Sequence, residues 1–292
     1  MSNKWHNIAD RNKLMWQDAL DSMSEPPVEK RRFAELADAD FSVVMVEFRE
    51  HEWLRPTLWN VAHVYGGLLS VGREYKVALT IVCGTSNVGL VRSIVDGWTG
   101  VEIRCLPRTN CTIEEYNGIL TSTSFYDLFR PCPVILVIQT DTLSRKRIPK
   151  SLVEKYSYVG APWWGPQNHG PPDAVVGNGG YSLRDVESCR RVCESMTFST
   201  AEDMNEDLFF AKYLRLSDKE SPQESKRKTL APADVARAFS VEQVPHDDPS
   251  GMHQAWRFHL PAMVKKWLAG VPGTNPSLNL SDGIMVPEGL CP

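Results

Sequence analysis

The sequence predicts an α/β fold in which a mostly parallel central sheet is flanked by helices. Short apolar runs alternate with segments of helical spacing, an order typical of parallel sheets. The runs are apolar at nearly every position, as in strands covered on both faces. Strands are expected over 41–48, 77–83, 101–106 and 133–139, and helices over about 54–65, 87–97 and 112–128.

The flanking segments have other patterns. Residues 1–23 have helical spacing and end before Pro26-Pro27, and helices are also expected near 185–195 and 203–215. Residues 217–228 are polar and are predicted to form an exposed loop. We divide the chain into an N-terminal helical extension (1–30), a central domain (31–265) and a C-terminal tail (266–292).

Composition narrows the function classes. The chain has 292 residues, of which 42% are hydrophobic, as in ordinary globular proteins. Its net charge of -4 gives no overall positive potential that would attract nucleic acid. The longest apolar runs are too short for a transmembrane segment, and residues 1–10 lack a secretory pattern. We therefore expect a cytoplasmic protein, in the host cytoplasm if it is viral. The seven scattered cysteines are expected to be reduced thiols.

Gln139-Thr140-Asp141 follows the most apolar expected strand. Ligands of doubly wound sheets bind beyond the carboxyl ends of the strands, so Asp141 is a candidate ligand for Mg²⁺ or Mn²⁺. The alternative is that Asp141 is a turn residue or a helix cap.

Three further segments have a functional and a structural interpretation. The glycine-rich segment 177–180 suits close approach to a ligand, or a plain tight turn. Glu206 and Asp207 begin a helix, where carboxylates also favour the helix dipole. His253 is a candidate metal ligand or a buried structural histidine.

In their order along the chain, these segments resemble a little-characterised glycosyltransferase-like family of fungi, algae and large DNA viruses. The resemblance covers about residues 40–260, and its most specific part is Gly160-Ala161-Pro162-Trp163 together with the glycines at 177–180. It implies a GT-A, Rossmann-like fold. It also implies a transfer of sugar from a nucleotide-sugar donor.

The resemblance assigns roles to residues of this sequence. Gln139-Thr140-Asp141 is similar to the Asp-x-Asp metal motif, with Gln139 in place of the first acid. Asp207 would be the catalytic base, and Asp141 and His253 would bind the metal. Donor contacts are expected from Glu47, Arg49, Gln139, Thr140, Asp141, Gly179 and Gly180, and acceptor contacts from Trp163, Trp164, Asn178 and Glu206. Packing in the core is the alternative for the two tryptophans.

The expected activity is inverting transfer from a UDP-sugar, carrying a hexose or a pentose such as xylose, to a hydroxyl of a glycan acceptor. A divalent metal, Mn or Mg, would stabilise the leaving diphosphate. The first alternative is a carbohydrate- or nucleotide-sugar-binding pseudoenzyme without turnover. A nucleotidyltransferase is a poorer fit, because residues 41–55 contain no glycine for a phosphate loop.

Overall fold

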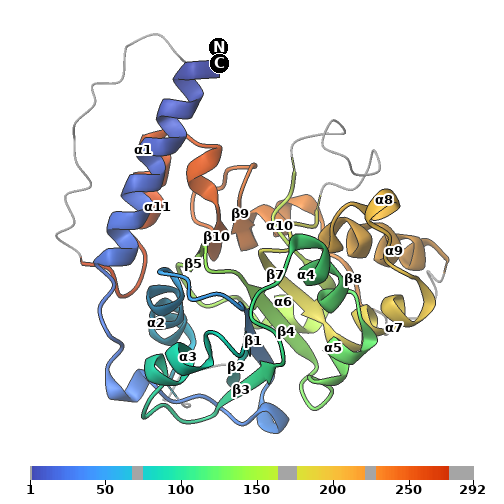
Figure 1. The fold of residues 1–292 in the computed structure, drawn as a ribbon. Coiled ribbons are helices and arrows are strands. Elements are labelled where there is room, and N and C mark those ends of the chain that lie inside the picture. Colours follow the sequence, from blue (N-terminus) through green and yellow to red (C-terminus); the bar gives the residue numbers. More distant parts are fainter. Residues whose placement is uncertain (1, 68–74, 164–175, 221–227, 276–292) are drawn as a thin grey trace.

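A computed structural model describes residues 2–67, 75–163, 176–220 and 228–275 (Figure 1). Its centre is a seven-stranded sheet with the order β3-β2-β1-β4-β7-β6-β8. The first four of these strands are mutually parallel: β1 (Phe41–Val46), β2 (Val77–Gly84), β3 (Val101–Leu106) and β4 (Val134–Ile138). The predicted α/β class and the four predicted strands are confirmed.

The other half of the sheet changes direction. Strand β7 (Tyr181–Asp185) is antiparallel to both β4 and β6 (Tyr156–Val159), and β8 (Thr229–Leu230) is parallel to β6. Because β7 is antiparallel to β4, its N-terminal end lies at the same edge as the carboxyl ends of β1 and β4. The sheet remains mostly parallel, which is compatible with a Rossmann-like fold.

Helices cover both faces of this sheet, as the apolar runs predicted. Alternate side chains of β1 point to opposite faces, Val43 and Met45 into one cluster and Val44 and Val46 into the other. The first face is covered by α2 (Leu54–Tyr65), α3 (Val88–Ile94), α6 (Lys150–Lys155) and α10 (Ala233–Phe239). The second is covered by α4 (Ile113–Leu120), α5 (Thr123–Asp127), α7 (Val186–Ser195) and α9 (Glu206–Glu220).

A small second sheet has the order β5-β10-β9, formed by β5 (Thr142–Ser144), β9 (Ser240–Val241) and β10 (Gly251–His253). Its apolar side chains share a cluster with helices α1 (Ser2–Asp21) and α11 (Pro261–Leu268). Figure 1 shows α1 and α11 side by side next to this sheet. Helices α1 and α11 therefore share one core, and α11 crosses the predicted boundary at 265.

Two predicted elements differ in the structure. The expected helix 112–128 is two helices, because the Ser122 hydroxyl accepts a hydrogen bond from Phe125 N and starts a new helix. The expected helix 203–215 begins at Glu206, after a short helix α8 (Thr200–Asp203), because Met204 has a left-handed φ of 61°. Helix α9 also extends to Glu220, into the segment predicted as a loop.

Candidate functional site

A cavity of about 530 Å³ opens where β1, β4 and the small sheet meet. Its volume is in the usual range for small-molecule sites. Eleven of the thirteen sequence-predicted site residues line it: Glu47, Arg49, Gln139, Thr140, Asp141, Asn178, Gly179, Gly180, Glu206, Asp207 and His253. The structure thus brings together residues that lie up to about two hundred positions apart in the sequence.

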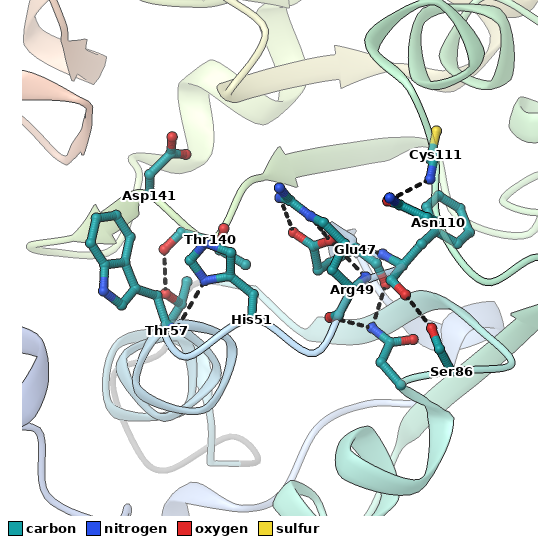
Figure 2. Close-up of polar contacts among 12 residues, drawn as sticks. Glu47, Arg49, His51, Thr57, Ser86, Asn110, Cys111, Thr140 and Asp141 are labelled. Atoms are coloured by element: carbon teal, nitrogen blue, oxygen red, sulfur yellow. Dashed lines mark hydrogen bonds and ion pairs between the residues drawn. The ribbon is translucent and has the colours of Figure 1, made fainter.

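Glu47 and Arg49 form a rigid pair at the carboxyl end of β1. One carboxylate oxygen of Glu47 accepts hydrogen bonds from Arg49 N and Nε at 2.9 and 2.8 Å, and the other accepts from Arg49 Nη2 at 2.8 Å (Figure 2). Asn87 fastens the same loop by donating to the carbonyl oxygens of both residues. Both carboxylate oxygens of Glu47 therefore bind Arg49. The Arg49 side chain is 56% exposed, so an anion in the cavity can contact it.

The register of the small sheet builds the opposite wall. Thr142 of β5 pairs with His253 of β10 in antiparallel register, so the next residues outward, Asp141 and Gln254, face each other. Val241 of β9 pairs with Met252 in parallel register, which brings Glu242 beside His253. One end of the small sheet therefore carries four residues that line the cavity: Asp141, His253, Gln254 and Glu242.

Asp141 and His253 each present one unsatisfied atom to the other. Asp141 Oδ1 and His253 Nε2 lie 3.5 Å apart, and within the described ranges neither atom has a hydrogen-bond partner. The remaining atoms are satisfied: Asp141 Oδ2 accepts from Gln254 Nε2 at 2.6 Å, and His253 Nδ1 lies 3.1 Å from Glu242 Oε1. Two buried polar atoms left over at one point are the expected property of a site for a ligand.

Charges dominate the protonation of this pair. Burial lowers the pKa of His253, but the carboxylates of Asp141 and Glu242 outweigh it and raise that pKa to about 10. Burial raises the pKa of Asp141, yet interactions with His253 and the Gln254 amide bring it below its ordinary value. The pair is therefore an aspartate beside an imidazolium at neutral pH.

A divalent cation fits this donor set once it displaces the imidazolium proton. A carboxylate oxygen and an imidazole nitrogen are accepted ligands for Mn²⁺, and such ions are often held by one or two protein ligands plus phosphate oxygens. Over the parts of the chain that are described, no group of three metal-ligating side chains is formed. The protein would thus supply Asp141 and His253. Gln139 has only an amide at the position where the Asp-x-Asp motif has its first carboxylate.

The glycines at 179 and 180 are required by packing within the site. A Cβ on Gly179 would lie 2.3 Å from Glu206 Oε1, and one on Gly180 would lie 2.4 Å from His253 Nε2. Asn178 closes the turn, since its Oδ1 accepts from Gly180 N at 3.1 Å. The glycine segment is therefore both a tight turn and the contact that presses the backbone against His253.

Asp207 lies at the N-terminus of α9 and faces the cavity. Its two carboxylate oxygens accept hydrogen bonds from Gly179 N at 3.1 Å and Leu208 N at 2.8 Å. Burial, followed by repulsion from Glu206, raises the pKa of Asp207 to about 8, although these two backbone donors oppose the rise. Asp207 is consequently a carboxyl group with an unusually high affinity for a proton.

Glu206 is committed to a buried ion pair. Its Oε1 accepts from Arg184 Nη2 at 2.6 Å, and the Arg184 side chain is fully buried. Arg184 Nε also donates to Ser182 Oγ, and the guanidinium lies over the rings of Tyr158 and Phe210. Arg184 Nη2 also donates to the carbonyl oxygen of Gly179, so this ion pair supports the glycine turn.

The predicted aromatic residues are placed differently from the rest. Trp163 is 9% exposed, is absent from the cavity lining, and packs its ring against Gly177. Of the two interpretations weighed for it, the geometry favours packing. Trp164 lies outside the described residues.

Sequence reasoning missed Glu242, Gln254, Arg184 and Arg257, all of which contact site residues. Gln254 and Arg184 stand next to recognised motifs, so adjacency was an available signal. Glu242 follows a two-residue strand, too short to detect by periodicity.

The fold and the site together define an α/β protein with an acidic, ligand-sized cavity at the edge of its central sheet. A family model described as a protein of unknown function (DUF5672) matches residues 100–253, just over half of the chain, so the chain belongs to that family. The matched region contains the segments around Asp141, Asp207 and His253 but not Glu47 and Arg49. No curated protein matches the chain. Within the described ranges, no helix is long and apolar enough to cross a membrane.

Proposed function

We propose that this protein is a GT-A glycosyltransferase that moves a sugar from a nucleotide-sugar donor to a hydroxyl group of a glycan in the cytoplasm. One observation carries the proposal. A single cavity brings together Asp141 and His253, whose facing atoms have no hydrogen-bond partner in the described parts of the chain, and Asp207, a carboxyl group with a raised pKa. The resemblance to glycosyltransferases assigns these same three residues to metal binding and to base catalysis.

The proposed reaction uses each part of the cavity. The acceptor hydroxyl oxygen forms a bond to the anomeric carbon, the bond from that carbon to the diphosphate breaks, and the hydroxyl proton passes to Asp207. A bound Mn²⁺ or Mg²⁺ would act as a Lewis acid for the charge that develops on the diphosphate. Arg49 and Arg257, which both line the cavity, would add positive charge for the same anion.

The raised pKa of Asp207 is compatible with this role. General catalysis is most effective when the pKa of the group lies near the working pH, and a positioned base contributes roughly 10² to 10⁴ in rate. If Asp207 lies opposite the leaving diphosphate, the transfer inverts the configuration of the sugar. We infer a UDP-sugar as the donor, carrying a hexose or a pentose such as xylose.

A binding protein without turnover is the second candidate. Gln139 at the first acidic position and a protonated Asp207 at neutral pH both favour it. Such a protein would bind the nucleotide sugar in the same cavity but would not release the nucleotide.

The test is nucleotide release from a panel of nucleotide sugars, with Mn²⁺ or with EDTA, by the wild type and by Asp207→Asn. The exposed Glu202→Gln on the preceding helix α8 is the matched control. We expect release by the wild type and the control, and a loss of about 10² or more in Asp207→Asn. Release that is unaffected by Asp207→Asn would remove the proposed base, whereas donor binding without release by the wild type would favour the binding protein.

A further inference from the structure

Two residues without an expected role, Glu242 and Gln254, stand directly behind Asp141 and His253. In each member of the pair, one polar atom points away from the other member. Glu242 contacts His253 Nδ1, and Gln254 donates to Asp141 Oδ2. We propose that Glu242 and Gln254 are positioning residues that hold Asp141 and His253 as a pre-formed two-ligand site for a divalent cation. The proposal rests on the proposed function only for the use to which that cation is put.

Glu242 fixes the orientation of the imidazole. Its side chain is 9% exposed, that of His253 is 7% exposed, and Glu242 Oε1 lies 3.1 Å from Nδ1. With Nδ1 occupied by the carboxylate, Nε2 is directed at Asp141 Oδ1. A carboxylate behind a histidine is the usual arrangement for orienting a metal-binding ring, and it increases the ring's basicity as a ligand.

Gln254 fixes the aspartate through an unfavourable backbone conformation. Its φ of 44° and ψ of 29° are left-handed, a region that is unfavourable for a residue with a Cβ. In this conformation Gln254 N donates to the carbonyl of Asp141 at 3.2 Å and Nε2 donates to Oδ2 at 2.6 Å. Arg257 Nη1 donates to Gln254 Oε1 at 2.6 Å and so orients the amide. The strain persists where the side chain has a specific task, which is to leave Oδ1 as the free oxygen.

The register of the small sheet explains why these contacts are mutual. Asp141, His253 and Glu242 come from three neighbouring strand ends, and Gln254 follows His253 directly. Asp141 Oδ2 and His253 Nδ1 therefore have partners within the protein, and as far as the chain is described only Oδ1 and Nε2 remain for a ligand. Ligands held by fixed partners lose less freedom on binding, so the cation is expected to bind without the nucleotide.

The experiment is a titration of the full chain with Mn²⁺ alone, followed by the electron paramagnetic resonance signal of free Mn²⁺. The variants are Glu242→Gln, which keeps the shape but removes the charge, and Gln254→Gly, which removes the side chain but suits the left-handed backbone. Asp234→Asn, an exposed carboxylate of helix α10, controls for the loss of one negative charge. Thermal unfolding of each variant is recorded in parallel.

We expect Mn²⁺ affinity to fall by about 10- to 100-fold in Glu242→Gln and in Gln254→Gly, and to stay at the wild-type value in Asp234→Asn. The thermal unfolding curves identify any variant that has lost its fold, so weaker Mn²⁺ binding by a folded variant reports positioning and not general destabilisation. If Glu242→Gln does not fold, Gln254→Gly decides the outcome alone.

Two results would overturn the proposal: a wild type that binds no Mn²⁺ up to millimolar concentration, or a Gln254→Gly variant with wild-type affinity. Failure of the proposed function gives a different result. In that case Mn²⁺ binds and both variants weaken it, but no nucleotide sugar is turned over.

Discussion

Replacing Asp207 by asparagine is expected to change how folding stability depends on pH. The folded protein raises the pKa of Asp207 from an ordinary value of 3.8 to about 8. Between these values the folded chain keeps a proton that the unfolded chain has released. Stability therefore falls as the pH rises through this window, and the loss is complete above the folded pKa.

The magnitude follows from the linkage of one proton. Each pH unit inside the window removes about 1.4 kcal/mol of unfolding free energy. Between pH 5 and pH 7 the wild type should thus lose about 3 kcal/mol relative to Asp207→Asn, which has no proton to release. The asparagine keeps only one acceptor oxygen for the two backbone donors, Gly179 N and Leu208 N, so it loses one hydrogen bond, and this loss offsets the stability of the variant by an amount that does not depend on pH.

The assay is urea unfolding of both proteins at half-unit steps of pH from 5 to 9, with the exposed Glu202→Gln as control. The difference in unfolding free energy between Asp207→Asn and the wild type should grow with pH and level off above about 8. Parallel curves across this range would refute the raised pKa. If Asp207 is also the base, nucleotide release by the wild type should increase over the same window, because only the ionised carboxylate accepts a proton.

Three further predictions concern the packing and the charges of the site. Arg184→Met should lose about 3–5 kcal/mol in urea unfolding, because it leaves the Glu206 carboxylate buried without its partner, and adding Glu206→Met should recover part of that loss. Gly180→Ala should cost about 1–3 kcal/mol and weaken Mn²⁺ binding, because its Cβ would lie 2.4 Å from His253 Nε2. Gly89→Ala, where the Cβ meets nothing within 4 Å, is the matched control. Mn²⁺ affinity should rise about tenfold per pH unit below the His253 pKa, with one proton released per ion by calorimetry in two buffers, because the metal replaces the imidazolium proton.

Local pattern was sufficient for the parallel half of the fold. Helices cover both faces of three strands, and the runs at 41–48, 77–83 and 133–139 are therefore apolar at successive positions. A continuous apolar run is a local pattern, so the sequence alone predicts these strands. Elements of two or three residues, such as β9 and β10, carry no readable period. They form because long-range pairing and the α1–α11 core hold them.

The sequence by itself determined the class of fold and the candidate residues, since glycine spacing, strand-end polar residues and helix-start carboxylates are local chemistry. Only the tertiary structure decided what those residues can do. Antiparallel pairing of β10 with β5 places His253 and Gln254 beside Asp141, more than a hundred residues away, and leaves two atoms unsatisfied there. Burial and repulsion from Glu206 raise the pKa of Asp207, and Glu206 itself forms a buried ion pair with Arg184. Proximity and desolvation depend on the packed chain, so neither could be read from residue types.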